Sequence, residues 1–339
     1  MEFSFREISS EDYDWIAKTI NSDEVSYFLL DIVPKTENEV LEAIKRRITG
    51  VKDIVCELDG VPVGYACISL GIGRVRHVAT LMTMYVRREY WGRGIGSALI
   101  RKVVSIAKEE GCRKVVLWVF EDNDKAIRIY EKVGFIKCVK LPEVAYIGGK
   151  WRNVIIMSLD INKGELSKNF DINYSGDYDG DLYVRYIKNR DLGEINRLQN
   201  CPESTKSTHL IPPTSMDATR RWYEEINSLR GLFAYGCYEN EKMLGYVRFI
   251  AGSRPFDCVW IREVLVDVFA KPLIASEALL SAVINFKVRY GYHRIIYDVP
   301  VVADYIIKPL EKLGFKKAGV ISQYYLIDES LVDSAYYIY

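Results

Sequence analysis

The sequence predicts an α/β (α+β) fold that is built twice along the chain, each copy a mixed central sheet flanked by helices. Short apolar runs typical of strands alternate with amphipathic helical patterns through both halves of the chain. A shift of 180 residues also aligns Val86–Lys137 with Val266–Lys317 without a gap, and 13 of these 52 pairs are identical. Because chance would give roughly three identities, we interpret the two halves as a tandem repeat.

The repeat divides the chain into a first domain over residues 1–161, a linker over 162–181 and a second domain over 182–339. The linker, Asn162–Asp181, is polar and contains three glycines. Its D-Y-D-G-D cluster lacks the distal glutamate that an EF-hand calcium loop needs. We therefore expect a solvated acidic linker there.

The elements expected in each copy follow from periodicity and turn residues. In the first copy the expected strands are Phe3–Ile8, Ile54–Leu58, Pro62–Leu70, Thr80–Val86, Lys114–Phe120 and Lys150–Asp160. The expected helices are Asp12–Thr19, Glu37–Ile48, Ser97–Glu110 and one that opens at Asn123. The turn at Asp59-Gly60 joins the two hairpin strands. The second copy repeats the series with a strand over Tyr183–Ile187, helices over Leu192–Gln199 and Asp217–Ser228, and a hairpin turn at Glu239–Glu241.

Composition excludes several classes of protein. Lys plus Arg and Asp plus Glu are both 46 in 339 residues, so no basic field indicates a nucleic-acid partner. No apolar run approaches the ~18 residues of a membrane span, and the first residues lack a signal-peptide pattern. The seven cysteines are scattered, as expected for a reducing cytoplasm, and the three histidines lie far apart. We expect a cytoplasmic protein without a metal.

A glycine loop is the most informative feature. Gly92, Gly94 and Gly96 lie between an apolar strand and an amphipathic helix. Such a loop can turn tightly and point several N–H groups, together with the positive end of the helix dipole, at one anion. The spacing matches neither a P-loop nor a dinucleotide-binding fingerprint, since no Lys-Ser or Lys-Thr follows and Ser97 replaces the third glycine of the latter.

A second motif lies at a fixed distance downstream, where Asn123, Ala126, Tyr130, Gly134 and Phe135 form N-x-x-A-x-x-x-Y-x-x-x-G-F. Together the two motifs resemble the GNAT superfamily of acyl-CoA N-acyltransferases, whose loop reads [QR]-x-x-G-x-[GA]. The match is close from Thr80 to Lys137. One departure is Trp91, which occupies the [QR] position, but the family holds phosphate mainly through backbone donors.

The resemblance implies that acetyl-CoA is the co-substrate and that the strand before the loop pairs with its pantetheine arm. The residues it assigns to cofactor binding are Met84, Tyr85, Val86, Trp91, Gly92, Arg93, Gly94, Ile95, Gly96, Ser97, Asn123 and Tyr130. Tyr130 matches the position of a general acid in many family members, so it is expected to protonate the departing thiolate. Asn123 opens a helix and is also a natural N-cap.

The general base stays open. Where related ribosomal-protein alanine acetyltransferases carry a strand glutamate, this chain has Leu117-Trp118-Val119. The candidates are four titratable residues: Glu121, Glu24, Asp31 and His77. By analogy with the family, Ser22–Pro34 borders the acceptor site, although ordinary packing would explain its apolar residues equally well.

The second copy has lost the polar features of the site. Gly92, Gly94 and Gly96 align with three residues that cannot form the same loop: Pro272, Ile274 and Ser276. Asn123 aligns with Ala303 and Tyr130 with Leu310, and Pro309 is expected to interrupt the last helix. Glu263 and Asp298 stand in place of Thr83 and Trp118 and are expected to serve structure or ligand recognition. We expect the second copy to be catalytically silent.

The sequence thus favours an N-acetyltransferase that passes acetyl from acetyl-CoA directly to an amine acceptor, such as a protein N-terminus, a lysine or a small-molecule amine. The alternative is a non-catalytic CoA-binding or scaffold protein built from two such domains, and a preference for longer acyl chains stays open. The duplication supplies a pseudo-dimer within one chain, which is compatible with a monomer. No nucleic acid or membrane partner is expected.

Overall fold

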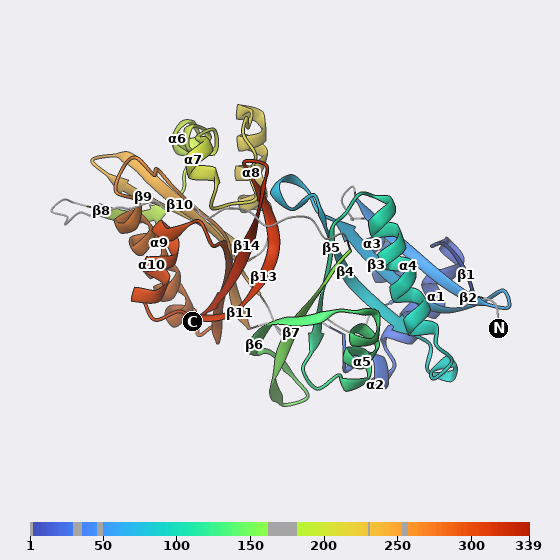
Figure 1. Cartoon of the computed structure of the whole chain (residues 1–339). Helices are drawn as coiled ribbons and strands as arrows, with labels where there is room; N and C mark the ends of the chain where they lie inside the picture. The colour runs from blue at the N-terminus through green and yellow to red at the C-terminus, as the bar shows by residue number, and fades with distance from the viewer. Residues whose placement is uncertain (1–2, 30–35, 46–49, 162–181, 230, 253–256) are drawn as a thin grey trace. The chain divides into compact units, whose positions relative to one another are not determined.

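The computed structural model describes residues 3–29, 36–45, 50–161, 182–229, 231–252 and 257–339 (Figure 1). The chain divides into two compact units, one of Met1–Ile72 with Arg76–Gly164 and one of Gly73–Val75 with Glu165–Tyr339. Each unit is described by itself below. The linker expected over Asn162–Asp181 lies outside the described residues.

The first unit contains one mixed sheet. Its strands are β1 (Phe3–Glu7), β2 (Val51–Leu58), β3 (Val61–Leu70), β4 (Val78–Val86), β5 (Lys114–Phe120), β6 (Ile136–Ile147) and β7 (Lys150–Asp160). They lie in the order β1-β2-β3-β4-β5-β7-β6, and every neighbouring pair is antiparallel except β4 with β5. The parallel pair at the centre is the one joined by the glycine loop and a helix.

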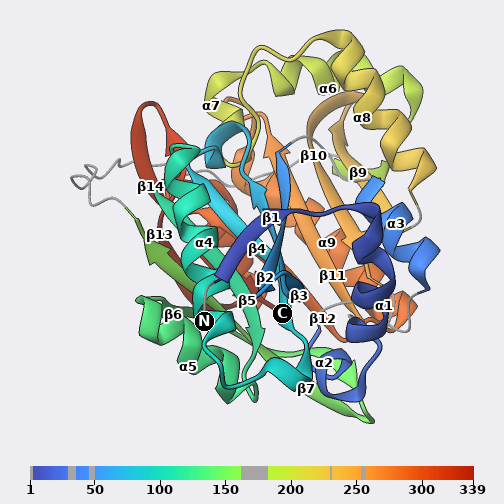
Figure 2. The same ribbon diagram turned by 90° about the vertical axis from the view of Figure 1, so that its right-hand side faces the viewer.

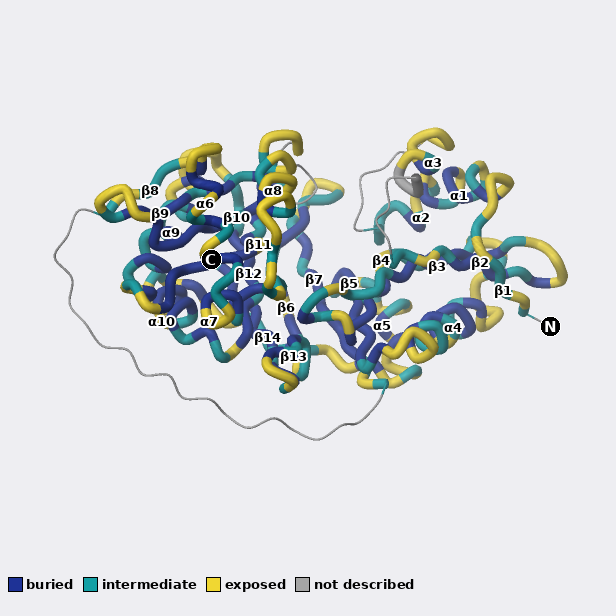
Figure 3. The backbone as a smooth tube through the Cα atoms, turned by 90° about the horizontal axis from the view of Figure 1, so that it is seen from above, coloured by how far each residue is buried: buried dark blue, intermediate teal, exposed yellow. Residues whose placement is uncertain are grey.

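Helices cover both faces of this sheet: α1 (Tyr13–Ile20), α2 (Asp23–Ser26), α3 (Glu37–Lys45), α4 (Ile95–Glu109) and α5 (Asp124–Val133). Alternate strand residues point to opposite faces. Ile54 and Ala66 therefore join the core under α4 and α5, while Val55 and Tyr65 join the core under α1 and α3. Figure 3 shows β2, β3 and β4 between these two groups of helices.

The second unit has the same succession of strands: β8 (Leu182–Tyr186), β9 (Leu232–Glu239), β10 (Lys242–Ala251), β11 (Cys258–Val266), β12 (Arg294–Pro300), β13 (Lys316–Ile327) and β14 (Ser330–Ile338). The order is β8-β9-β10-β11-β12-β14-β13, with β11 and β12 as the parallel pair. Its helices are α6 (Leu192–Gln199), α7 (Pro202–Thr205), α8 (Met216–Ser228), α9 (Pro272–Tyr290) and α10 (Asp304–Lys312). Figure 2 shows α6, α7 and α8 gathered together.

Short 3₁₀ turns complete the two units, at Ser10–Asp12, Gly73–Val75, Arg88–Tyr90 and Asn189–Asp191. No described helix is both long enough and apolar enough to span a bilayer.

One local arrangement recurs in both units. Arg6 binds the buried Asp12 through two nitrogens at 2.6 and 2.9 Å, and Arg185 binds Asp191 in the same way at 2.8 and 2.9 Å. In each case the carboxylate also accepts the backbone N–H three residues earlier, so it fixes the turn that starts the first helix. The two units therefore share a detail of side-chain chemistry besides the strand order.

The predicted fold class, a mixed sheet flanked by helices, is confirmed in each unit. The expected strands are present with ends within three residues of the prediction. Two local expectations are wrong. Helix α4 begins at Ile95 rather than Ser97, because Gly94 forms its N-cap in the left-handed conformation. Helix α10 runs through Pro309 instead of being interrupted, since the tertiary packing of a buried proline compensates for the one backbone donor it lacks.

Candidate active site

The site begins where strands β4 and β5 separate. Their parallel pairing runs from Val78 opposite Lys114 to Leu81 opposite Leu117 and ends there. At the next residue, Met82, β4 has a bulge, since Cys67 of β3 pairs with Thr83 and Ile68 pairs with Leu81. Beyond the bulge β4 stays paired with β3 as far as Val86. Its other edge therefore presents backbone N–H and C=O groups to the gap beside β5.

The glycine loop closes one end of this gap. Gly92 and Gly94 have φ angles of 79° and 82°, which only glycine adopts readily. The first intrahelical bond of α4 runs from Ala98 N–H to the Gly94 carbonyl at 3.0 Å. The preceding amides of the first turn therefore need a partner from outside the helix, and the helix dipole makes an anion the favoured one.

Gly96 has a different role from the other two glycines. It is already part of α4, and a Cβ at this position would lie 3.3 Å from Cδ1 of Ile129 in α5. Its lack of a side chain lets the two helices approach closely beside the loop.

These elements enclose a groove of about 1090 Å³ in the first unit. All but one of the residues assigned to cofactor binding line it: Met84, Tyr85, Val86, Trp91, Gly92, Gly94, Ile95, Gly96, Ser97, Asn123 and Tyr130. The exception is Arg93, whose exposed guanidinium lies 5.3 Å from the ring centre of Tyr90. The volume is larger than that of most small-molecule sites, as an extended ligand requires.

Tyr130 lies in the wall of the groove, on helix α5. The side chain is buried, packs beside Phe135 with 5.9 Å between ring centres, and belongs to the core under α4 and α5. Burial raises the pKa of its phenol above the ordinary value of 10. The group is therefore a protonated donor throughout the neutral range, as a general acid must be.

Asn123 caps helix α5. Its side-chain oxygen accepts the N–H of Ala126 at 3.3 Å, which is the structural role considered from the sequence. Asn123 also lines the groove, so the side chain that caps α5 is part of the groove wall.

Trp91 folds back over the glycine loop. Its indole N–H donates to the Val86 carbonyl at 2.7 Å, and the Lys125 ammonium lies 5.2 Å from the ring centre. In place of the family's Gln or Arg, this chain therefore has an aromatic side chain that ties the loop to the end of β4 and brings a cation of α5 beside it.

The four candidate bases differ in position. Glu24 lines the groove and forms an ion pair with Arg88. Glu121 does not line it, because its carboxylate binds Lys140 and Asn153, which lower its pKa. His77 is buried immediately before β4, at the end of that strand away from the loop. Asp31 lies outside the described residues, as do residues 30–34 of the expected acceptor border.

Sequence reasoning missed a buried arginine behind the groove wall. Arg152 of β7 donates to the backbone carbonyl of Tyr27 and to the carboxylate of Asp122. Its guanidinium lies 4.1 Å from the ring centre of Tyr27 and 3.8 Å from that of Phe120. Tyr27, Phe28 and Asp122 all line the groove, so Arg152 holds one of its walls to the sheet. No sequence signal links these residues, which come from distant segments.

In the second unit the corresponding gap is filled. Strands β11 and β12 also stop pairing, at Ile261 opposite Tyr297. Tyr297 aligns with Leu117, and its hydroxyl accepts the backbone N–H of Val264, the residue aligned with Met84, at 3.3 Å. The hydroxyl of Ser207 donates to the Val264 carbonyl at 3.0 Å. Both backbone groups that would meet a ligand are thus bonded within the unit.

The glycine loop is also replaced there. Helix α9 starts at Pro272, three residues before the position aligned with Ile95, so helix occupies most of the loop. Leu310, which aligns with Tyr130, is fully buried, and Ala303 provides no side-chain cap for α10. Glu263 accepts the indole N–H of Trp222 at 3.0 Å, and Asp298 accepts the Tyr325 hydroxyl at 2.7 Å. Both carboxylates are therefore bonded to side chains of this unit.

A bulged strand that parts from its parallel neighbour, a glycine-capped helix and a phenol lie together in one groove of the first unit. Residues 17–135 match the sequence model of the acetyltransferase (GNAT) family. The first unit of this chain is a GNAT acetyltransferase domain. Members of that family use acyl-CoA and amine acceptors.

Three relatives each match less than half of this chain. The chain is 44% identical over 84 residues to an uncharacterized N-acetyltransferase of Methanocaldococcus jannaschii, a match that covers 24% of this chain and 37% of that protein. It is 25% identical over 131 residues to the L-amino acid N-acyltransferase MnaT of Escherichia coli, covering 38% of this chain and 74% of that protein. Among solved structures, the spermidine N-acetyltransferase of Vibrio cholerae in complex with CoA and spermine is similar, with a TM-score of 0.43 and 21% sequence identity. The match covers 47% of this chain and 95% of that chain.

Proposed function

We propose that the first unit is an acetyl-CoA-dependent N-acetyltransferase that transfers acetyl directly to an amine. The observation that carries the proposal is the single groove that joins the free edge of β4, the start of α4 and Tyr130. The N-terminal amides of α4 would hold the diphosphate, and the edge of β4 from Met84 to Val86 would pair with the pantetheine amides. The size of the groove and the backbone donors that line it support acetyl-CoA as the co-substrate.

In the proposed step, the neutral amine nitrogen attacks the thioester carbonyl carbon and a C–N bond forms. A backbone N–H of β4 donates to the carbonyl oxygen as negative charge develops. The C–S bond then breaks, Tyr130 donates its proton to the departing sulfur, and the amine's excess proton passes to solvent, from which Tyr130 is reprotonated. The products are an amide and free CoA.

We further propose that the chain is a tandem duplication of domains 1–161 and 182–339 in which only the first binds acetyl-CoA. The common strand order and the repeated Arg–Asp pair support the duplication. The hydroxyl of Tyr297 against Val264 and the helical turn at Pro272 support a silent second domain.

The acceptor would enter beside α2. Asp23 and Glu24 of α2 line the groove, and the Glu24 carboxylate forms an ion pair with Arg88. The E. coli relative acts on L-amino acids and the V. cholerae structure holds spermine, so both kinds of amine belong in a substrate panel.

An assay of thiol release from acetyl-CoA with a panel of amines tests the function. We expect release that depends on the amine, and isothermal titration should give one CoA site per chain. Tight CoA binding without amine-dependent release would instead favour the non-catalytic CoA-binding or scaffold protein.

Replacing Arg152 by methionine should raise the KM for the amine by about tenfold or more, because the wall that contains Tyr27 and Phe28 loses a charge-assisted anchor. The KM for acetyl-CoA should change little, since Arg152 does not line the groove. Steady-state kinetics in both substrates measure this split.

The matched control is Lys150→Met on the same strand, whose exposed ammonium lies 5.8 Å from the Tyr27 ring centre. It should leave both KM values unchanged. An equal rise in both KM values for Arg152→Met would show a general loss of structure and contradict the positioning role.

A further inference from the structure

A second cavity lies in the second unit, away from the filled gap. It has a volume of about 610 Å³ and lies between strands β8 and β9 and the part of α9 from Ala278 to Tyr290. The filled gap lies instead at β11, β12 and the N-terminus of α9. This cavity has no part in the proposed acetyl transfer.

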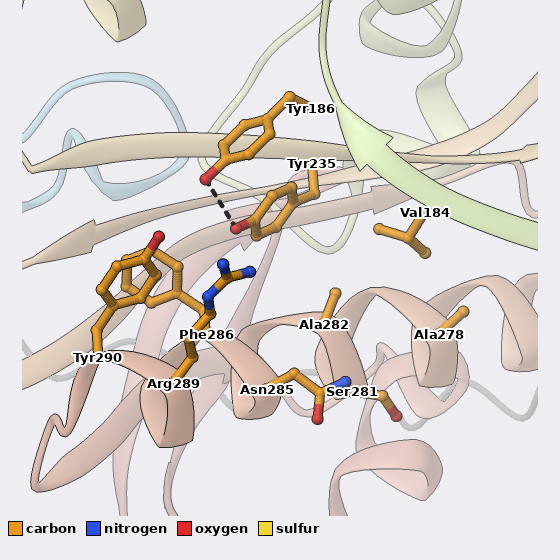
Figure 4. Close-up of a pocket in the computed structure, with 10 residues that line it drawn as sticks. All are labelled: Val184, Tyr186, Tyr235, Ala278, Ser281, Ala282, Asn285, Phe286, Arg289 and Tyr290. Atoms are coloured by element: carbon orange, nitrogen blue, oxygen red, sulfur yellow. Dashed lines mark hydrogen bonds between the residues drawn. The ribbon is translucent and has the colours of Figure 1, made fainter.

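Small side chains on α9 create the space. Ala278, Ser281 and Ala282 line the cavity, and Figure 4 shows the two alanines on the side of the helix that faces the strands. Under the 180-residue offset, Ser281 and Ala282 stand where the first unit has Arg101 and Lys102. Loss of these two long side chains leaves a volume typical of small-molecule sites.

One end of the cavity is a firm aromatic wall. Phe286 is buried, and its ring centre lies 4.8 Å from that of Phe233, 4.9 Å from that of Phe249 and 4.6 Å from that of Tyr290. These contacts hold the Phe286 ring in place, and the exposed ring of Tyr290 beside it offers a planar aromatic ligand a face on which to stack.

The polar groups of the cavity are donors. The Tyr235 hydroxyl donates to that of Tyr186 at 3.1 Å, which leaves the Tyr186 proton free for an acceptor. Figure 4 shows the Arg289 guanidinium pointing from α9 toward the Tyr235 hydroxyl. Burial and the Tyr186 hydrogen bond raise the pKa of Tyr235, so the phenol stays protonated at neutral pH.

The charge among the residues that line the cavity is positive. Among its lining residues Arg289 is the one charged group, with Asn285 and Ser281 as neutral polar neighbours. A guanidinium beside phenolic donors is complementary to a carboxylate. From this geometry we propose that the second unit carries a binding site for a planar aromatic carboxylate, with its ring against Phe286 and Tyr290 and its carboxylate on Arg289 and Tyr186.

The test uses the full chain and 2-naphthoate as the probe in isothermal titration. We expect a Kd below about 1 mM, and weaker binding of the neutral isostere 2-naphthamide. Saturating CoA should not displace the probe, because its proposed groove is in the first unit. The result is thereby independent of the proposed acetyltransferase activity.

Three variants locate the site. Arg289→Gln should weaken 2-naphthoate by about tenfold or more. Ala282→Lys, which restores the residue of the first unit, should abolish binding by filling the cavity. Arg220→Gln, on α8, is the matched control for charge and should bind as the wild type does.

The melting temperatures of the variants show whether each one folds. No binding to the full chain, binding unchanged by both Arg289→Gln and Ala282→Lys, or displacement by CoA would each overturn the proposal.

Discussion

Tyr130→Phe should lower kcat by about 10²–10⁴-fold while the KM for acetyl-CoA stays nearly constant. The substitution removes one oxygen from a buried side chain and keeps the ring that packs beside Phe135. The loss would therefore report the proton that Tyr130 donates to the departing sulfur. Amine-dependent thiol release under saturating acetyl-CoA measures it.

The pH profile gives a second readout of the same role. Because burial raises the pKa of Tyr130 above 10, the phenol is in its active, protonated form at every pH below that value. Activity should therefore not fall on the alkaline side up to pH 9, and the rise with pH should follow deprotonation of the amine.

Tyr90→Phe is the matched control, since Tyr90 also lines the groove but lies beside the loop. It should keep the wild-type kcat. If Tyr130→Phe also retained the full kcat between pH 6 and 9, the general-acid role would be wrong.

Gly94→Ala should weaken CoA binding by about tenfold or more, which corresponds to about 1.4 kcal/mol. Gly94 caps α4 at φ 82°, where an L side chain is strained by about 1–2 kcal/mol. The strain is relieved if the loop rotates, and rotation turns the amides of α4 away from the diphosphate. Isothermal titration with CoA measures the change.

Gly111→Ala provides a control at the other end of the same helix. Gly111 has φ 73°, and a Cβ would meet no atom within 4 Å at either glycine. Both variants should lose similar thermal stability, but only Gly94→Ala should lose CoA affinity. Equal losses of CoA affinity in both variants would mean that the effect is one of stability. The proposal that the N-terminal amides of α4 hold the diphosphate would then be wrong.

Much of the site could be predicted because its signals are local. The spacing from Gly92 to Gly134 determines a loop, a helix, a strand and a second helix, whose caps are encoded in single residues such as Gly94 and Asn123. The resemblance to GNAT proteins rested on this stretch, and the match over residues 17–135 confirms the family. Gly96 was misread as a turn residue because its close neighbour, Ile129, lies 33 positions away in the sequence.

What the sequence determined alone was therefore the order of elements and the glycine loop, since each depends on residues within a few turns of one another. The tertiary structure decided which groups meet: the bulge at Met82 that frees the edge of β4, Arg152 against Tyr27, and Tyr297 against Val264. It also decided that the small residues of α9 leave a cavity under β8 and β9. Such contacts join distant segments, and their energies depend on packing and burial that only the folded chain defines.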